Sequence, residues 1–148
     1  MTPAFRRVLI ICAAMLTAGM ASGCASEPSA PPGVFFPTVP ISDEYPAGVM
    51  RGRLELEDGC LFVTSGSERH LLLWPEGYTA RRDGETIEIF TEDRGPIARV
   101  GEPIRVGGGE RRPLEMGGAA AAERSITVLT GGDIPERCGD LYWLVSPI

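Results

Sequence analysis

The chain is predicted to fold as a small antiparallel β-barrel, OB-like or SH3-like, with a compact β-sandwich as the alternative. Three observations predict this all-β class. Short apolar or alternating segments recur at close spacing after residue 48, glycine-rich turns separate them, and no long helical segment is apparent. Closure into a barrel would remove the exposed strand edges that otherwise promote aggregation.

The first predicted strands lead into a hairpin. Residues 51–56 alternate with a period of two, with the apolar residues on even positions. The Glu57-Asp58-Gly59 segment that follows is typical of a tight turn of the Asp-Gly type. Residues 60–63 and 71–74 are continuous apolar runs joined by a polar loop, so we expect them to be buried hairpin strands.

The middle of the chain continues this pattern. Residues 86–90 alternate, residues 92–95 are a turn, and residues 97–100 are the next predicted strand. A further short strand covers residues 104–106, and we expect the glycines at 107–109 to form a turn or bulge that needs positive φ. A phosphate-binding loop is not expected there, because no helix clearly follows and the chain has no lysine.

Toward the C-terminus the pattern of short strands is interrupted and then resumes. Residues 110–124 are predicted to be a mobile insertion or one poor helical turn. Residues 125–129 return to a strand pattern, and a loop with two glycines and a proline follows. Residues 141–145 are predicted to close the fold as its last strand.

The first residues have the pattern of an export signal. Arg6 and Arg7 supply positive charge before an apolar run of about 14 residues, short of the roughly 20 that span a bilayer as a helix. The run ends in Ala21-Ser22-Gly23-Cys24. The small residues also suit cleavage of an ordinary secretory signal, and an uncleaved membrane anchor is a further alternative.

The segment Ala21-Ser22-Gly23-Cys24 resembles the lipobox of bacterial lipoproteins, with alanine where that family most often has leucine. The resemblance implies that the signal peptide, residues 1–23, is removed and that the Cys24 thiol carries a diacylglycerol. Further acylation of its amine, for example with palmitate, would complete the lipid anchor. Two or more acyl chains hold a protein stably on a membrane.

The same resemblance implies a location in the cell envelope. The anchored protein would lie on the outer face of the plasma membrane or, in a diderm host, on the outer membrane facing the periplasm. Ala25 directly after the cysteine resembles the outer-membrane pattern. The membrane, reached through Cys24, is therefore the first expected partner, with an envelope protein as a possible second.

Residues 24–47 are predicted to be a proline-rich tether that holds the folded domain, residues 48–148, away from the membrane. Proline-rich chain is semi-rigid and extends by about 3 Å per residue. The cluster Val34-Phe35-Phe36 interrupts the tether. We expect it to dock on the domain, since bare aromatic side chains lower solubility, with contact to a partner as the alternative.

The charge of the chain excludes some partners. Its formal net charge is −6, and loss of Arg6 and Arg7 with the signal would leave about −8. An acidic protein is not expected to bind nucleic acid or to adhere electrostatically to anionic lipid. All of its basic residues apart from the one histidine are arginines, so Schiff-base chemistry on a lysine is excluded.

The four cysteines are assigned to three different roles. Cys12 leaves with the signal, and Cys24 is the predicted lipidation site. Cys60 and Cys138 remain as one pair, which we expect to be a disulfide in an oxidising compartment. This bridge would close a loop of about 80 residues and stabilise the fold by about 4 kcal/mol. Two free thiols are the alternative.

No catalytic or metal-binding set is apparent. His70 is the only histidine, and Ser65 and Ser67 share its loop, which disfavours the geometry of a nucleophile with a separate base. His70, Cys60 and Cys138 would supply three ligands, one fewer than a closed zinc site has. They also lack the close sequence spacing of zinc ligand pairs. Paired carboxylates occur mainly at turns and are interpreted as a solvated face. We therefore expect no enzyme, no metal and no cofactor.

Aromatic residues are the remaining candidates for a binding site. Aromatic side chains on the face of a barrel can stack on ligands. Tyr142 and Trp143 are adjacent and must point to opposite faces of a strand, so one of them is a candidate for exposure. The possible ligand face consists of Trp74, Tyr78, Tyr142 and Trp143. The alternative is that these residues belong to the core.

A second resemblance covers most of residues 50–145 and rests on turn and core residues. The motifs are Gly59-Cys60-Leu61, Leu73-Trp74-Pro75, Arg99-Val100-Gly101 and Gly107-Gly108-Gly109, ending in Cys138 and Tyr142-Trp143. Together they resemble a group of small bacterial envelope proteins without assigned function. The resemblance supports the fold and implies no activity.

Three functions remain compatible with these expectations. The first is a lipid-anchored envelope protein acting as a non-catalytic binding or scaffolding module. The second is a small-ligand carrier or an enzyme with an unrecognised pocket, and the third is a structural lipoprotein for envelope integrity. A complete export and anchoring signal attached to a domain without a catalytic set favours the first.

Overall fold

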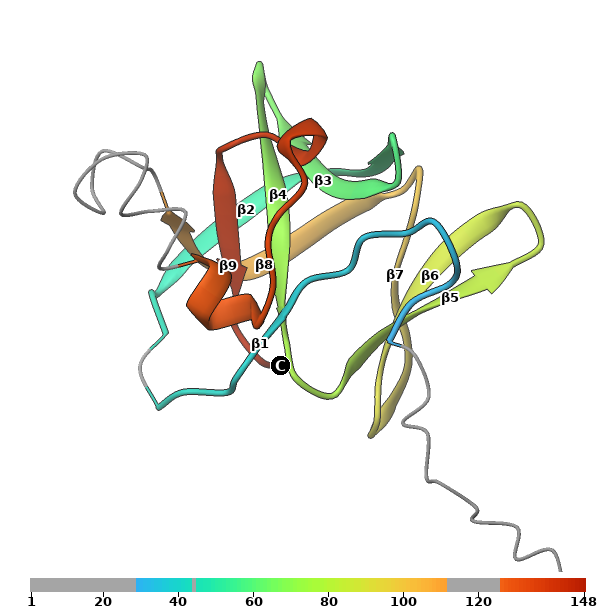
Figure 1. Cartoon of the computed structure of the whole chain (residues 1–148). Coiled ribbons are helices and arrows are strands. Elements are labelled where there is room, and N and C mark those ends of the chain that lie inside the picture. Colours follow the sequence, from blue (N-terminus) through green and yellow to red (C-terminus); the bar gives the residue numbers. More distant parts are fainter. Residues whose placement is uncertain (1–28, 44, 112–125) are drawn as a thin grey trace, which may run out of the picture.

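The computed structural model describes residues 29–43, 45–111 and 126–148 (Figure 1). The signal peptide 1–23, Cys12, Cys24, the start of the tether and most of the insertion at 110–124 lie outside these residues. The main strands are β2 (Gly48–Glu57), β3 (Cys60–Ser65), β4 (Glu68–Pro75), β8 (Pro103–Arg111) and β9 (Tyr142–Val145). They form a closed barrel in the order β2-β3-β4-β9-β8, with β8 returning to β2.

Antiparallel pairing holds throughout this barrel except between β4 and β9, which run parallel. A five-stranded barrel closed in this way is the OB-like form of the predicted fold. The predicted all-β barrel is therefore confirmed, and the sandwich alternative does not apply. Leu54, Leu72 and Trp74 fill its interior together with other fully buried apolar side chains.

The β2–β3 turn follows the predicted chemistry. Asp58 and Gly59 both have positive φ, at 49° and 79°, and Glu57 pairs with Cys60 across the turn. Two consecutive positive φ values match the twist of an antiparallel hairpin, which explains the preference for Asp-Gly. The predicted hairpin of apolar runs is β3 paired with β4.

A second sheet covers one end of the barrel. It consists of β5 (Tyr78–Asp83), β6 (Thr86–Thr91) and β7 (Arg94–Arg99), a three-stranded antiparallel meander inserted between β4 and β8 (Figure 1). Ala80, Ile87 and Ile89 from this sheet belong to the same core as the barrel interior. Strand β5 was not predicted from the sequence, because its exposed end, Arg-Arg-Asp, carries no apolar alternation.

Two predicted elements differ from the structure. Residues 107–109, expected as a turn or bulge, continue β8, although Gly108 does have positive φ at 139°. Residues 126–130 are helical, although 125–129 were expected to form a strand. Ile126 is buried against the outer face of the barrel while Val128 is 81% exposed. Packing of one apolar residue on an existing surface has overridden the local preference for strand.

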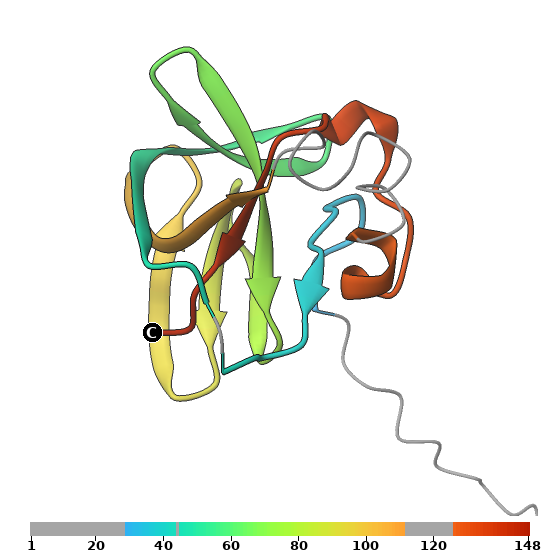
Figure 2. The same cartoon turned by 90° about the vertical axis from the view of Figure 1, so that its left-hand side faces the viewer.

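The segment before the barrel lies on it. Figure 2 shows β1 (Thr38–Val39) alongside β4, and the two strands pair in parallel. Phe36 is buried and stacks on Trp74 with ring centroids 5.5 Å apart, so the aromatic cluster docks as expected. Further upstream the Ser29 carbonyl accepts a hydrogen bond from the Ala80 amide at 2.7 Å. Residues 29–39 therefore lie along the domain, so the part of the predicted tether that can act as a spacer is shorter than expected.

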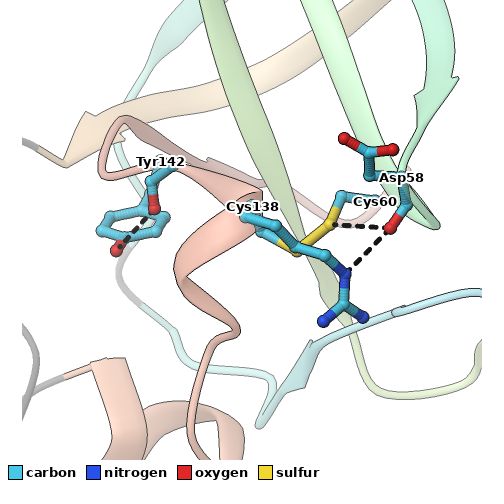
Figure 3. Close-up of a disulfide and its surroundings, with 6 residues drawn as sticks. Asp58, Cys60, Cys138 and Tyr142 are labelled. Atoms are coloured by element: carbon cyan, nitrogen blue, oxygen red, sulfur yellow. Dashed lines mark hydrogen bonds between the residues drawn. A yellow bond between two sulfur atoms is a disulfide. The ribbon is translucent and has the colours of Figure 1, made fainter.

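A disulfide links Cys60 at the start of β3 to Cys138, which ends a short 3-10 turn at Glu136–Cys138 (Figure 3). Both cysteines are fully buried in a second apolar cluster on the outer face of the barrel. The predicted pairing is confirmed. The Asp58 carbonyl beside it accepts a hydrogen bond from Arg137 Nε at 2.9 Å (Figure 3).

Candidate functional site

The end of the barrel away from β5–β7 carries polar side chains that face inward. Side chains alternate along a strand, so Glu68 and His70 lie on the same face of β4 as the buried Leu72. On β8 the same alternation places Glu110 on the face of the core residue Val106. These polar residues therefore continue the inward face of the barrel to its open end.

The short strand β9 brings the two sets together. Trp143 is the register partner of both Leu72 on β4 and Glu110 on β8. His70 Nε2 consequently lies 2.9 Å from Oε1 of Glu110. The His70 and Trp143 rings meet edge to face, with centroids 6.3 Å apart.

These side chains border a pocket of about 530 Å³, which we call the barrel mouth. Its lining residues are Val49, Met50, Arg51, Ser65, Glu68, His70, Arg105, Glu110 and Trp143. Both signs of charge, one imidazole and one indole are present. The barrel mouth is therefore suited to bind a polar or charged ligand with an apolar part.

His70 is the most buried polar residue of the mouth, at 4% exposed. Its Nε2 atom points toward Glu110, whereas its Nδ1 atom is buried and has no hydrogen-bond partner among the described residues. One nitrogen of His70 and one carboxylate oxygen each of Glu68 and Glu110, atoms that could bind a metal ion, lie within 4.8 Å of one another. The three groups can therefore contact one bound atom. The His70 imidazole is already buried, so little further side-chain entropy is lost when a ligand binds to it.

Two glycines make room for the Trp143 indole. A Cβ atom at Gly48 would lie 3.2 Å from the ring, and one at Gly108 would lie 2.8 Å from Nε1. The same Nε1 donates a hydrogen bond to the Gly107 carbonyl at 3.3 Å. Gly108, which was predicted to lie in a turn or bulge, thus acts with Gly48 to let the indole reach the barrel mouth.

The four aromatic residues of the predicted ligand face do not share a surface. Trp74 and Tyr78 lie in the barrel core, with centroids 5.8 Å apart, and burial raises the pKa of Tyr78 above its ordinary 10.0. Tyr142 belongs to the outer apolar cluster. Trp143 alone contributes to the mouth, and it does point to the opposite face from Tyr142, as expected.

Outside the mouth, Glu88 is the one acidic or basic side chain that is buried among the described residues. It lies on β6 and forms an ion pair with Arg99 on β7. The hydrogen bond to this carboxylate raises the pKa of Arg99. The pair joins the neighbouring strands β6 and β7.

Sequence reasoning missed the pairing of His70 with Glu110, which are 40 residues apart. The sequence did contain a hint that His70 faces inward. His70 directly precedes the apolar run 71–74, and in a strand it shares a face with Leu72, two residues later. Within the described residues, no serine, threonine or cysteine is hydrogen-bonded to His70. Ser65 does reach the mouth, whereas Cys60 and Cys138 lie elsewhere, in the disulfide.

No protein-family model, curated protein or solved structure matches this chain. Among the described residues, no helix has the length and apolar character needed to cross a membrane. The resemblance to lipoproteins stays a prediction from the first residues of the chain.

Proposed function

We propose that this protein is a lipid-anchored envelope protein that acts as a non-catalytic binding module, with the barrel mouth as its binding site. The observation that carries the proposal is the difference between the two ends of the barrel. The β5–β7 sheet at the covered end has a surface pocket lined by Arg81, Phe90 and Glu92 among others. Only the pocket at the open end, of these two, contains a buried histidine that lies beside a carboxylate and an indole.

The path of the chain supports an outward orientation of the mouth. Ser29, the first described residue, is hydrogen-bonded to Ala80 on β5, at the covered end. Ser29, which is five residues after Cys24, therefore lies on the side opposite the mouth. In Figure 1 the start of β4 is at the top, and β5–β7 lie at the lower right. An anchor at Cys24 would leave the mouth accessible from the aqueous side.

The composition of the mouth supports binding more than catalysis. The His70–Glu110 pair resembles an acid-base pair, but no nucleophile is hydrogen-bonded to His70 among the described residues. Val49 at the rim is 51% exposed, which adds apolar contact area next to the polar groups. Apolar area with a few oriented polar groups is typical of a recognition site. A pocket of about 530 Å³ is also large enough for a small molecule, which keeps the ligand carrier as the second candidate.

Replacing Cys24 with alanine is expected to release the protein from membranes into the soluble fraction. The reason is that the acyl chains, worth about 0.8 kcal/mol per buried methylene, would be the attachment. Fractionation after alkaline washing measures the effect, with Ala25→Ser as the control that keeps the cysteine. Tight membrane association of Cys24→Ala would contradict the lipid anchor.

A photoreactive amino acid at Val49 is expected to form a discrete cross-linked product in cells, because this position borders the mouth. Ile41 is the matched control, since it is also branched and exposed (61%) but lies beside Tyr78 and the C-terminus. Gel mobility and mass spectrometry identify the product. Equal products at both positions, or none at Val49, would contradict binding of a macromolecular partner at the mouth.

A further inference from the structure

We propose that the barrel mouth binds a divalent transition-metal ion, of the Zn²⁺ class, through Glu68, His70 and Glu110. The proposal rests on the proposed function in one respect, that the mouth is a binding site, and it names the ligand. It differs from the zinc site weighed in the sequence analysis, because Cys60 and Cys138 are joined in the disulfide.

Strand geometry brings the three donors together. Glu68 and His70 are two residues apart on β4 and share a face, while Glu110 reaches them from β8 across the position of Trp143. Their donor atoms lie within 4.8 Å of one another, and the His70–Glu110 distance is 2.9 Å. Ligand atoms around a tetrahedral zinc ion are about 3.3 Å apart, so modest side-chain rotations complete the site.

The donor types select the class of metal. Imidazole nitrogen suits Zn²⁺, Cu²⁺ and Ni²⁺, whereas Ca²⁺ and Mg²⁺ prefer a shell made of oxygen atoms. The two carboxylates balance the charge of a divalent ion. Arg51 and Arg105, which also line the mouth, leave the site less acidic than the two glutamates alone would make it.

Burial of His70 makes it the fixed ligand. Its ring is held against Trp143 and the strand neighbours, so Nε2 faces the carboxylates before any ion arrives. Glu68 is exposed and Glu110 half-buried, and the ion would replace contacts that both carboxylates make in its absence. Three protein ligands leave a fourth position open to water or to a side chain of a partner. An ion in this place would connect the barrel mouth to whatever binds there.

Calorimetric titration with ZnCl₂ tests the proposal on the full-length chain in detergent, oxidised and with a histidine-free tag. We expect one-site binding, and a rise in the unfolding temperature on addition of Zn²⁺. Because His70 is the only histidine of the chain, its imidazole NMR signals report this site without assignment ambiguity. Those signals should shift with Zn²⁺ and stay unchanged with Mg²⁺.

Glu68→Gln and Glu110→Gln are each expected to weaken binding by about tenfold or more, and His70→Gln to abolish it. Glu92→Gln is the matched control, an exposed glutamate outside the mouth that should bind Zn²⁺ as the original chain does. The two glutamate variants keep the test valid if His70→Gln fails to fold. Every variant retains the same cysteines, so zinc bound by a free thiol would not differ between them.

Absence of a shift in the His70 signals with Zn²⁺, or wild-type affinity in both glutamate variants, would overturn the metal site. That outcome differs from failure of the proposed function. Cross-linking at Val49 tests the mouth as a partner site without added metal, so it can succeed where the zinc titration fails.

Discussion

Replacing both Cys60 and Cys138 with alanine is expected to lower the free energy of unfolding by about 4 kcal/mol, from the closed-loop entropy. The two residues are 78 positions apart, so the bridge restricts a large part of the unfolded chain. The total stability of a folded protein is typically about 5–15 kcal/mol, so this loss would be a large share of it.

The position of the bridge adds a local consequence. It joins the start of β3 to the 3-10 turn just before β9, and β9 is the strand that closes the barrel between β4 and β8. Loss of the bridge should therefore increase amide hydrogen exchange in β9 more than in β5–β7. Chemical denaturation of the oxidised chain and the double alanine variant measures the global effect, and hydrogen exchange measures the local one.

The control for this prediction is the oxidised chain carrying Cys12→Ser, which retains the bridge. The double substitution is preferred to a single one because it leaves no unpaired buried thiol. Equal stability of the double alanine variant and the oxidised control would contradict the prediction, and so would uniform acceleration of exchange in both sheets.

Replacing Gly108 with alanine is expected to destabilise the barrel by about 3 kcal/mol, through strain and overpacking together. Gly108 has a φ of 139°, which side chains rarely adopt, and a Cβ there would lie 1.9 Å from the Leu144 carbonyl oxygen. Since that oxygen belongs to the neighbouring strand, relief requires movement of β8 against β9. The new methyl group would also displace the Trp143 indole, so the tryptophan fluorescence of the folded state should change.

Gly107→Ala is the matched control, one residue away in the same strand. A Cβ at Gly107 would meet the Ser146 side chain at 3.6 Å, an ordinary contact, and this glycine does not have positive φ. Thermal unfolding of the two variants compares them directly. Similar stabilities would show that β8 and β9 do not approach each other as closely as described.

Local chemistry made several elements predictable. Asp58-Gly59 specifies a tight turn because its backbone needs positive φ at both residues, and the apolar run Leu71–Trp74 marks a buried strand. The disulfide was predictable because two cysteines remain once Cys12 and Cys24 are assigned to the export signal. Each of these inferences needs information from only a few residues or from a count.

Elements that depend on distant partners were not predictable in this way. Residues 126–130 are helical although their side chains suit a strand, because Ile126 packs on a cluster assembled from β3, β4 and β9. Gly107, Gly108 and Gly109 look like a turn until β9 and Trp143 are placed against them. The four candidate aromatic residues divided between the two apolar clusters and the mouth for the same reason.

By itself, the sequence determined the β class, the first hairpin, the cysteine pairing and the features that resemble a lipoprotein signal. Tertiary structure alone decided the barrel mouth, because His70 and Glu110 meet only when β9 inserts between β4 and β8. Alternation within a strand follows from its own residues. The register between strands far apart in sequence follows from how the whole barrel closes and packs.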